Sequence, residues 1–324
     1  MQLQRVFFLI LAIVGYTPLQ VLAQSPYPMK PIRVVVPFAA GGGNDTLGRL
    51  VAQRLSESFK QQAYVDNRGG AAGRVGAEHV AKSPADGYTL MIGGSSVMIT
   101  APALYKSLPY DMQKDFAPIT LVGSNSYVLL VHPSVPARAV KEFIALCRAR
   151  PGALNYASSG PGGPAHLAGE LFQSLAQVKI VHVPYKGSAP ALLGVIGGET
   201  DLTFSNIQPA APVIQSGRLR AIAVTSLQRS SILPAIPTIA ESGLPGFEVA
   251  IFYGVLAPAA TPIDIIARLN AVLVKGLNTA DTRKRLEADG TEPLTSTPDE
   301  FARLVRSETE KWTKLIRAAG IKPE

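Results

Sequence analysis

The fold of this chain follows from one stretch, Arg33-Val34-Val35-Val36-Pro37-Phe38-Ala39-Ala40-Gly41-Gly42-Gly43-Asn44-Asp45. Residues 32–36 form a β-branched run, which is typical of a strand buried on both faces. Three glycines follow, and apolar residues then recur at helical spacing from Leu47 to Phe59. Such a loop presents unpaired main-chain N–H groups to an anion, and we expect Asn44 or Asp45 to cap the helix. The alternative for an isolated loop of this kind is a tight turn that binds nothing.

The same arrangement occurs again in the second half of the chain. Residues 154–158 have the composition of a strand, 159–164 are rich in glycine and proline, and 166–175 have helical apolar spacing. Further strand-like runs occupy 63–67, 88–92, 180–184 and 201–206. Strands that alternate with helices predict an α/β fold with parallel sheets covered on both faces. Ligands of such folds bind beyond the carboxyl ends of the strands, where both glycine loops fall.

Two extended segments, 117–131 and 219–225, are expected to cross between two domains. We therefore predict that domain I consists of 24–124 and 226–324, and that domain II consists of 125–225. Each domain then holds one βα sheet, with a glycine loop on its side of a cleft. An anion between the domains would meet main-chain donors from both walls.

Residues 1–23 have the pattern of a secretory signal peptide. Arg5 supplies the positive charge, 6–14 the apolar core, and Val21-Leu22-Ala23 the cleavage site before Gln24. The apolar run is too short to span a bilayer core of about 30 Å. Cys147 is the only cysteine, so the cleavage site offers no lipid acceptor and no intrachain disulfide can form. We expect export to the periplasm and cleavage near Ala23.

The formal net charge of +8 favours an anionic partner. Lysine and arginine are not clustered in a run, and they do not alternate with aromatic residues. The sequence therefore predicts that nucleic acid is not a partner.

A set of motifs along the chain resembles the periplasmic substrate-binding proteins of tripartite tricarboxylate transporters, the Bug or TctC-like family. The motifs are Val36–Gly42 with Asp45, Asn67-Arg68 with Gly70–Gly76, Asp86–Leu90, Asn155–Ser158, His166–Glu170, His182–Gly187 and Ala221–Thr225. The resemblance implies a two-domain Venus-flytrap fold of the type II periplasmic binding class. It also implies a small carboxylate ligand and delivery to the integral-membrane subunits of a transporter, and we expect a monomer.

In that family the ligand carboxylates are held mainly by main-chain N–H groups and ordered waters at helix starts. The resemblance assigns ligand binding on one wall to Phe38, Ala39, Ala40, Gly41, Gly42, Asn44, Asp45, Ala71, Ala72 and Gly73. On the other wall it assigns Ser158, Ser159, Gly160, Gly162, Gly163 and His166, with Tyr185 and Asn206 nearer the rim or hinge. For His166, a capping or packing role is equally open. Gly69, Pro164 and Ser205 depart from the family pattern of proline, serine and aspartate, which leaves the identity of the carboxylate open.

The sequence offers little for catalysis, cofactor binding or metal binding. His79, His132, His166 and His182 do not form an HExxH motif, and no Gly-x-Ser-x-Gly elbow occurs. A phosphate-binding Gly-x₄-Gly-Lys-Ser/Thr motif is also absent, and Gly-x-Gly-x-x-Gly fails at Thr46. We therefore predict a receptor that is not an enzyme and needs neither cofactor nor metal. An exported hydrolase acting on a small carboxylated substrate is the alternative.

Overall fold

The computed structural model describes residues 27–321. The predicted signal peptide at 1–23 lies outside the described residues. Within 27–321, no helix combines the length and the apolar composition needed to cross a membrane.

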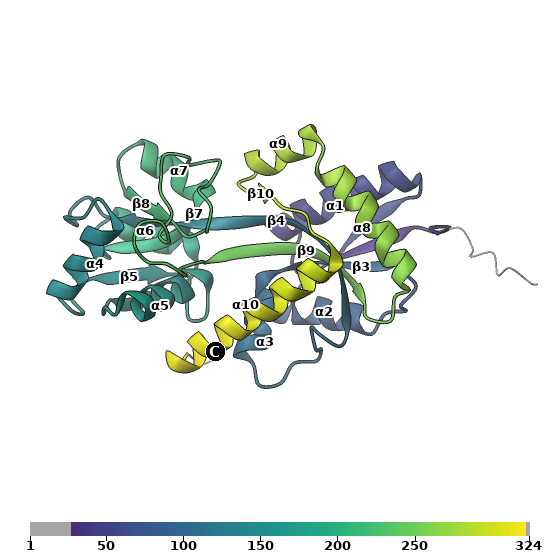
Figure 1. Cartoon of the computed structure of the whole chain (residues 1–324), viewed down its shortest axis with the longest axis horizontal. Helices are drawn as coiled ribbons and strands as arrows, with labels where there is room; N and C mark the ends of the chain where they lie inside the picture. Colours follow the sequence, from purple (N-terminus) through teal and green to yellow (C-terminus); the bar gives the residue numbers. More distant parts are fainter. Residues whose placement is uncertain (1–26, 322–324) are drawn as a thin grey trace, which may run out of the picture.

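Two sheets are joined by two long antiparallel strands (Figure 1). Strand β4 (Phe116–Val131) takes part in both sheets, and β9 (Ala250–Pro258) pairs with the first part of β4. The first sheet has the order β2-β1-β3-β9-β4, and the second continues as β4-β7-β5-β6, with β8 also paired to β4. The other strands are β1 (Ile32–Val36), β2 (Ala63–Asn67), β3 (Thr89–Gly94), β5 (Asn155–Ser158), β6 (Val181–Pro184), β7 (Leu202–Asn206), β8 (Arg220–Val224) and β10 (Glu292–Pro293).

The first lobe is built on the first sheet. Its helices are α1 (Gly43–Phe59), α2 (Arg74–Ala81), α3 (Ala101–Leu104), α8 (Ile263–Leu277), α9 (Ala280–Ala288) and α10 (Pro298–Ala318), with short turns at Ala71–Gly73 and Ser96–Thr100. Val34 and Val36 are fully buried beneath α1 and α8, as the β-branched composition of β1 predicts. Strands β1, β2 and β3 are parallel, so the loops after them meet at one edge of the sheet.

The second lobe is built on the second sheet. Its helices are α4 (Val140–Ala149), α5 (Pro164–Ala176), α6 (Ser188–Ile196) and α7 (Ile207–Gln215). Strands β5, β6 and β7 are parallel, and their carboxyl ends carry the starts of α5, α6 and α7. Helix α10 extends from the first lobe to contact α5, so it lies along both lobes (Figure 1).

The predicted return crossing at 219–225 is wrong. Strand β8 stays in the second lobe, where Val224 pairs with Val128, and the segment that crosses back is β9. The reason is that residues after β8 still belong to the second core. Phe247 packs against Phe172 and Phe204 at ring distances of 6.2 and 6.3 Å. The chain therefore re-enters the first sheet near residue 250 and not at the predicted residue 226.

Candidate functional site

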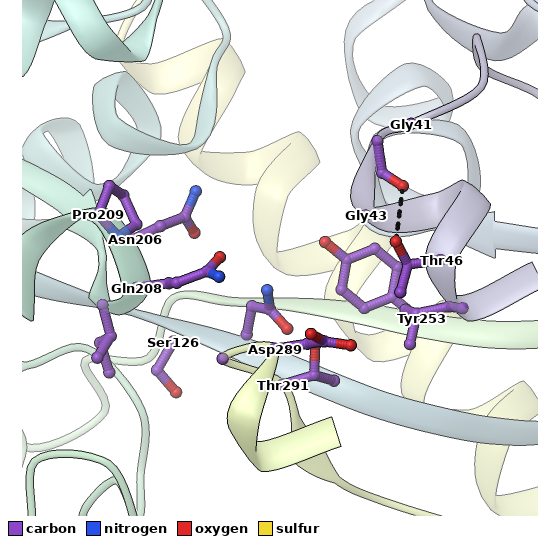
Figure 2. A pocket seen from close by; sticks show the side chains of 15 residues that line it. Gly41, Gly43, Thr46, Ser126, Asn206, Gln208, Pro209, Tyr253, Asp289 and Thr291 are labelled. Atoms are coloured by element: carbon purple, nitrogen blue, oxygen red, sulfur yellow. Dashed lines mark hydrogen bonds between the residues drawn. The ribbon is translucent and has the colours of Figure 1, made fainter. Parts of the chain in front are cut away.

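A cavity of about 580 Å³ separates the glycine loop after β1 from the start of α7. Figure 2 shows Gly41, Gly43, Thr46 and Tyr253 on one side, and Asn206, Gln208 and Pro209 on the other. Ser126 of β4 lies between them, together with Asp289 and Thr291 from the segment before β10. We call this cavity the polar chamber.

A second cavity, of about 360 Å³, lies beside the first and shares Tyr253 with it. Its lining is dominated by rings and aliphatic side chains, and we call it the apolar chamber. It is lined by Phe38, Asn44, Ala72, Gly94, Ser95, Ser96, Thr100, Ala101, Leu104, Tyr105, Pro161, Gly162, Gly163, Pro164, Leu167, Val249, Ala250, Ile251, Tyr253 and Trp312. Both lobes contribute to both chambers, so the chambers are parts of one interlobe cleft.

A third cavity, of about 470 Å³, lies in the second lobe between β5, α6 and α7. It shares Pro164 with the apolar chamber and Asn206 with the polar chamber. The cleft therefore continues into the carboxyl edge of the second sheet.

On the first wall, Asp45 holds the glycine loop in place. The residue is only 4% exposed, and its carboxylate accepts hydrogen bonds from Gly41 N at 2.9 Å, Asn67 Nδ2 at 3.0 Å and Arg49 Nε at 3.0 Å. These hydrogen bonds lower the pKa of the carboxyl group below its usual value, and the bond from the Gly41 N–H has the largest effect. The Asp45 side chain therefore faces the loop, and it lines none of the three cavities.

The expectation that Asn44 or Asp45 caps α1 is wrong. The N-cap is Gly42, and no side chain caps the helix. Asp45 is the third helical residue, so its side chain reaches back past the N-cap to Gly41. The main-chain N–H groups of Gly43 and Asn44, at the first two helical positions, stay free of intrahelical bonds at the edge of both chambers.

The loop before α2 is backbone-strained where it meets the apolar chamber. Residues 70–73 all have positive φ, at 136°, 47°, 54° and 91°, although Ala71 and Ala72 carry side chains. Gly73 is required there, because a Cβ would lie 2.5 Å from Val97 Cγ2 and 3.0 Å from Phe38 Cζ. Strain of this kind persists where surrounding contacts hold the backbone, and it often marks ligand-binding loops.

On the second wall, the loop between β5 and α5 uses its own glycine N–H groups. Gly160 N donates to Ser158 Oγ at 3.0 Å, Gly162 N to His166 Nδ1 at 2.9 Å, and Gly163 N to Gly160 O at 3.3 Å. Pro164 occupies the first helical position and has no N–H group. At the start of α5, the free main-chain N–H group that borders a cavity is therefore that of Ala165, which lines the third cavity.

Two stacked histidines, His166 and His182, hold the loop between β5 and α5 in place. The rings of His166 and His182 lie 4.0 Å apart at an angle of 10°, and His182 Nε2 is 2.6 Å from Ser158 Oγ. Because His166 Nδ1 accepts the Gly162 N–H, its proton in the neutral form is on Nε2, which is 3.8 Å from Glu170 Oε1. Glu170 also accepts from Tyr156 OH at 2.8 Å. His166 thus holds the loop without reaching the cavities.

Because His166 and His182 are stacked against each other, we expect the folded protein to lose stability in acid, between about pH 6.5 and about pH 4. Burial, followed by the neighbouring His166, lowers the pKa of His182 to about 4, whereas an unfolded histidine titrates near 6.5. The unfolded state therefore binds more protons between these values, and the free energy of unfolding should fall as the pH drops from about 6.5 to about 4. Urea unfolding of wild type and His182→Asn across this range measures the slope. The slope should be shallower in His182→Asn and unchanged in the control His132→Asn; equal slopes in all three would contradict the assignment.

The predicted site residues divide into two groups. Those that line a cavity are Phe38, Gly41, Gly42, Asn44, Ala72, Ser158, Ser159, Gly162, Gly163 and Asn206. Those that line none of the three are Ala39, Ala40, Asp45, Ala71, Gly73, Gly160, His166 and Tyr185. Tyr185 donates instead to Glu199 Oε2 at 3.0 Å, beneath α6.

Sequence reasoning missed Ser126 of β4, Tyr253 of β9, Gln208 of α7, and Tyr105 and Trp312 of the apolar chamber. For Ser126 and Tyr253 the available sequence signal is that β4 and β9 are long enough to cross between the lobes, and Gln208, Tyr105 and Trp312 do not share it.

Comparisons with known proteins place the chain in a family. The family described as "Tripartite tricarboxylate transporter family receptor" matches residues 47–321. Rpa4515 of R. palustris, solved with adipate, is 38% identical with a TM-score of 0.75, covering 92% of this chain and 100% of that one. The periplasmic binding protein BugD is 33% identical, with a TM-score of 0.70 and coverages of 92% and 100%. MatC of Rhodopseudomonas palustris, solved with malate, is 32% identical, with a TM-score of 0.69 and coverages of 90% and 100%.

Proposed function

The chain belongs to the tripartite tricarboxylate transporter family of receptors, and we propose from this premise that it binds a small carboxylate in the interlobe cleft. Its two-lobed α/β fold is that of the periplasmic binding proteins, as predicted. The neighbours solved with adipate and malate support a periplasmic solute-binding receptor for small carboxylates. The observation that carries the proposal is the start of α1, where the N–H groups of Gly43 and Asn44 are free at the edge of the cleft. On the other wall, the start of α5 offers the free N–H of Ala165.

The electrostatics of the cleft agree with binding by main-chain groups. No lysine or arginine lines either the polar or the apolar chamber, and Arg218 lines the third cavity. A carboxylate at the start of α1 would instead meet the free N–H groups of Gly43 and Asn44 and the positive end of the helix dipole. The ligand-binding residues that we propose are therefore nine of the ten predicted residues that line a cavity, Ser158 being left out, together with Gly43 and Tyr253.

We propose that the protein is not an enzyme. The one serine–histidine contact in the cleft region joins Ser158 Oγ to His182 Nε2. Ser158 is fully buried, and its hydroxyl oxygen already accepts the Gly160 N–H, so it is not placed as a nucleophile. Its role is structural, and this geometry gives no support to the hydrolase alternative.

We further propose that the mature protein is a periplasmic monomer that delivers its ligand to the integral-membrane subunits of the transporter. We propose that the permease recognises the ligand-bound, closed state, which would couple binding to delivery through closure of the lobes. The proposal rests on membership of the receptor family and on the two crossing strands that act as a hinge.

Isothermal titration calorimetry tests the function. Titration of the purified protein with adipate, malate, benzoate and glutamate should give one-to-one binding for at least one of them. The ligand should be recovered unchanged afterwards. Binding of none of a broad carboxylate panel, or conversion of a bound compound, would overturn the proposal.

A further inference from the structure

We infer that the ligand is an aryl monocarboxylate: its ring occupies the apolar chamber, and its carboxylate lies at the start of α1. This inference rests on the proposed function and narrows its ligand class. It is carried by four rings that line one cavity of about 360 Å³, namely Phe38, Tyr105, Tyr253 and Trp312. They come from the loop after β1, the end of α3, β9 and α10, so they surround the space from several sides. Aromatic walls favour a flat apolar body, which stacks on them or meets them edge to face.

The rings are fixed in position before any ligand arrives. Trp312 is only 4% exposed, and its Nε1 donates to Glu308 Oε2 at 3.0 Å. The guanidinium of Arg74 lies 4.4 Å from the ring centre of Tyr105. The ring of Phe38 lies beside Gly73, where an added Cβ would come within 3.0 Å of Phe38 Cζ. A preformed apolar wall avoids the entropy cost of ordering side chains on binding.

The polar groups of the apolar chamber suit one carboxylate and disfavour a second. Asn44 lies where the chamber meets the start of α1, and its free main-chain N–H can donate to one carboxylate there. Its buried side-chain Oδ1 is an acceptor without a hydrogen-bond partner among the described residues, so it disfavours a further carboxylate nearby. Ser95 Oγ is already occupied, because it accepts the Phe252 N–H at 2.7 Å. No charged side chain lines the chamber. A second carboxylate among the rings would therefore lose its water without gaining a cation.

The polar chamber also disfavours a second carboxylate. Its only charged lining residue is Asp289, which carries the same sign as the ligand. A dicarboxylate that extended from the start of α1 into this chamber would approach that carboxylate. A neutral polar substituent would instead meet Ser126 and Asn206, whose side-chain oxygens Oγ and Oδ1 lack partners among residues 27–321.

Trp312 offers a direct test, because it is the only tryptophan in the chain. Its emission should change on titration with benzoate, and the midpoint should agree with the calorimetric Kd. Adipate, with which the neighbour Rpa4515 was solved, serves as the reference carboxylate without a ring. We expect benzoate to bind at least tenfold more tightly than adipate.

The variant Tyr105→Ala removes one ring of the chamber and leaves both glycine loops intact. It should weaken benzoate binding about tenfold and alter adipate binding much less. Tyr64→Ala is the matched control, because Tyr64 lies on β2 and lines neither chamber. Adipate binding tenfold more tightly than benzoate, or equal benzoate affinity in Tyr105→Ala and wild type, would overturn the inference and leave the proposed function standing. Failure of every carboxylate to bind would instead overturn the proposed function.

Discussion

Gly162→Val is expected to weaken carboxylate binding by at least a factor of ten, about 1.4 kcal/mol or more. Gly162 has φ of +72°, a conformation that β-branched residues strongly resist. A Cβ at this position would also lie 3.2 Å from Leu104 Cδ2 of the opposite lobe. The valine would therefore distort the loop and push the lobes apart at the apolar chamber. Calorimetry with the carboxylate that binds wild type measures the loss.

Valine substitutions at two further glycines distinguish the effect of backbone strain from the effect of a side chain that projects into the cleft. Gly217 has φ of +69°, a Cβ added there would meet nothing within 4 Å, and the residue lines none of the three cavities described above. Gly217→Val should lose stability but keep its affinity. Gly42 has φ of −89°, so Gly42→Val should keep its stability and lose affinity by projecting into the polar chamber. If Gly162→Val and Gly217→Val bind equally well, the loop after β5 does not contact the ligand.

Removing the charge of Lys186 should reduce ligand affinity less than changing the geometry of the glycine loops. Lys186 is exposed in the loop after β6 and lines no chamber. Lys186→Ala is therefore the matched comparison for the glycine variants, and its affinity should stay within a factor of about three of wild type. A complete loss of binding in this variant, with both cleft glycine variants unaffected, would contradict binding by main-chain groups.

Local elements could be predicted because their signal lies in neighbouring residues. The bounds of β1 and β2 are confirmed at 32–36 and 63–67. The helix expected after the first glycine loop, with apolar spacing from Leu47 to Phe59, is α1 at Gly43–Phe59. The signal is a compact β-branched run in β1 and clear apolar spacing in α1. Helix α7 was missed because Pro209 and Pro212 interrupt the helical pattern, and α9 because it has few apolar residues.

Apart from Asn206 at the end of β7, the predicted residues that line a cavity lie in or beside the glycine-containing loops after β1, β2 and β5. Gly41, Gly42, Gly162 and Gly163 line the cleft, as expected from their place between a strand and a helix. Tyr253 and Trp312 could not be found in this way, because they enter the cleft through long-range packing of β9 and α10. The use of the Gly162 N–H by His166 was equally invisible, since it depends on a side chain in the next helix.

Asp45→Asn is expected to cost about 1–3 kcal/mol of stability and to weaken ligand binding about tenfold. The Asp45 carboxylate faces donors on both oxygens: Gly41 N and Arg49 Nε at Oδ2, and Asn67 Nδ2 at Oδ1. An asparagine amide supplies one oxygen only, so at least one of these donors would face the new NH₂ group in either orientation. The loop that carries Gly42 and Gly43 would lose its anchor, and with it the arrangement of free N–H groups at the start of α1.

The same substitution should change the response to acid below the range in which the histidines titrate. The folded-state pKa of Asp45 is depressed, so its contribution to stability is complete above the ordinary aspartate value of about 4 and is lost as the pH falls through the lower folded value. Urea unfolding at pH 7 and below pH 4 should therefore separate wild type from Asp45→Asn most strongly at pH 7. Asp281→Asn is the control, because Asp281 pairs with Arg54 at 3.0 Å on a side chain that is 86% exposed, and it should lie within about 0.5 kcal/mol of wild type. An Asp45→Asn protein that is as stable as this control at pH 7, and that binds as tightly, would show that the glycine loop keeps its shape without the buried carboxylate.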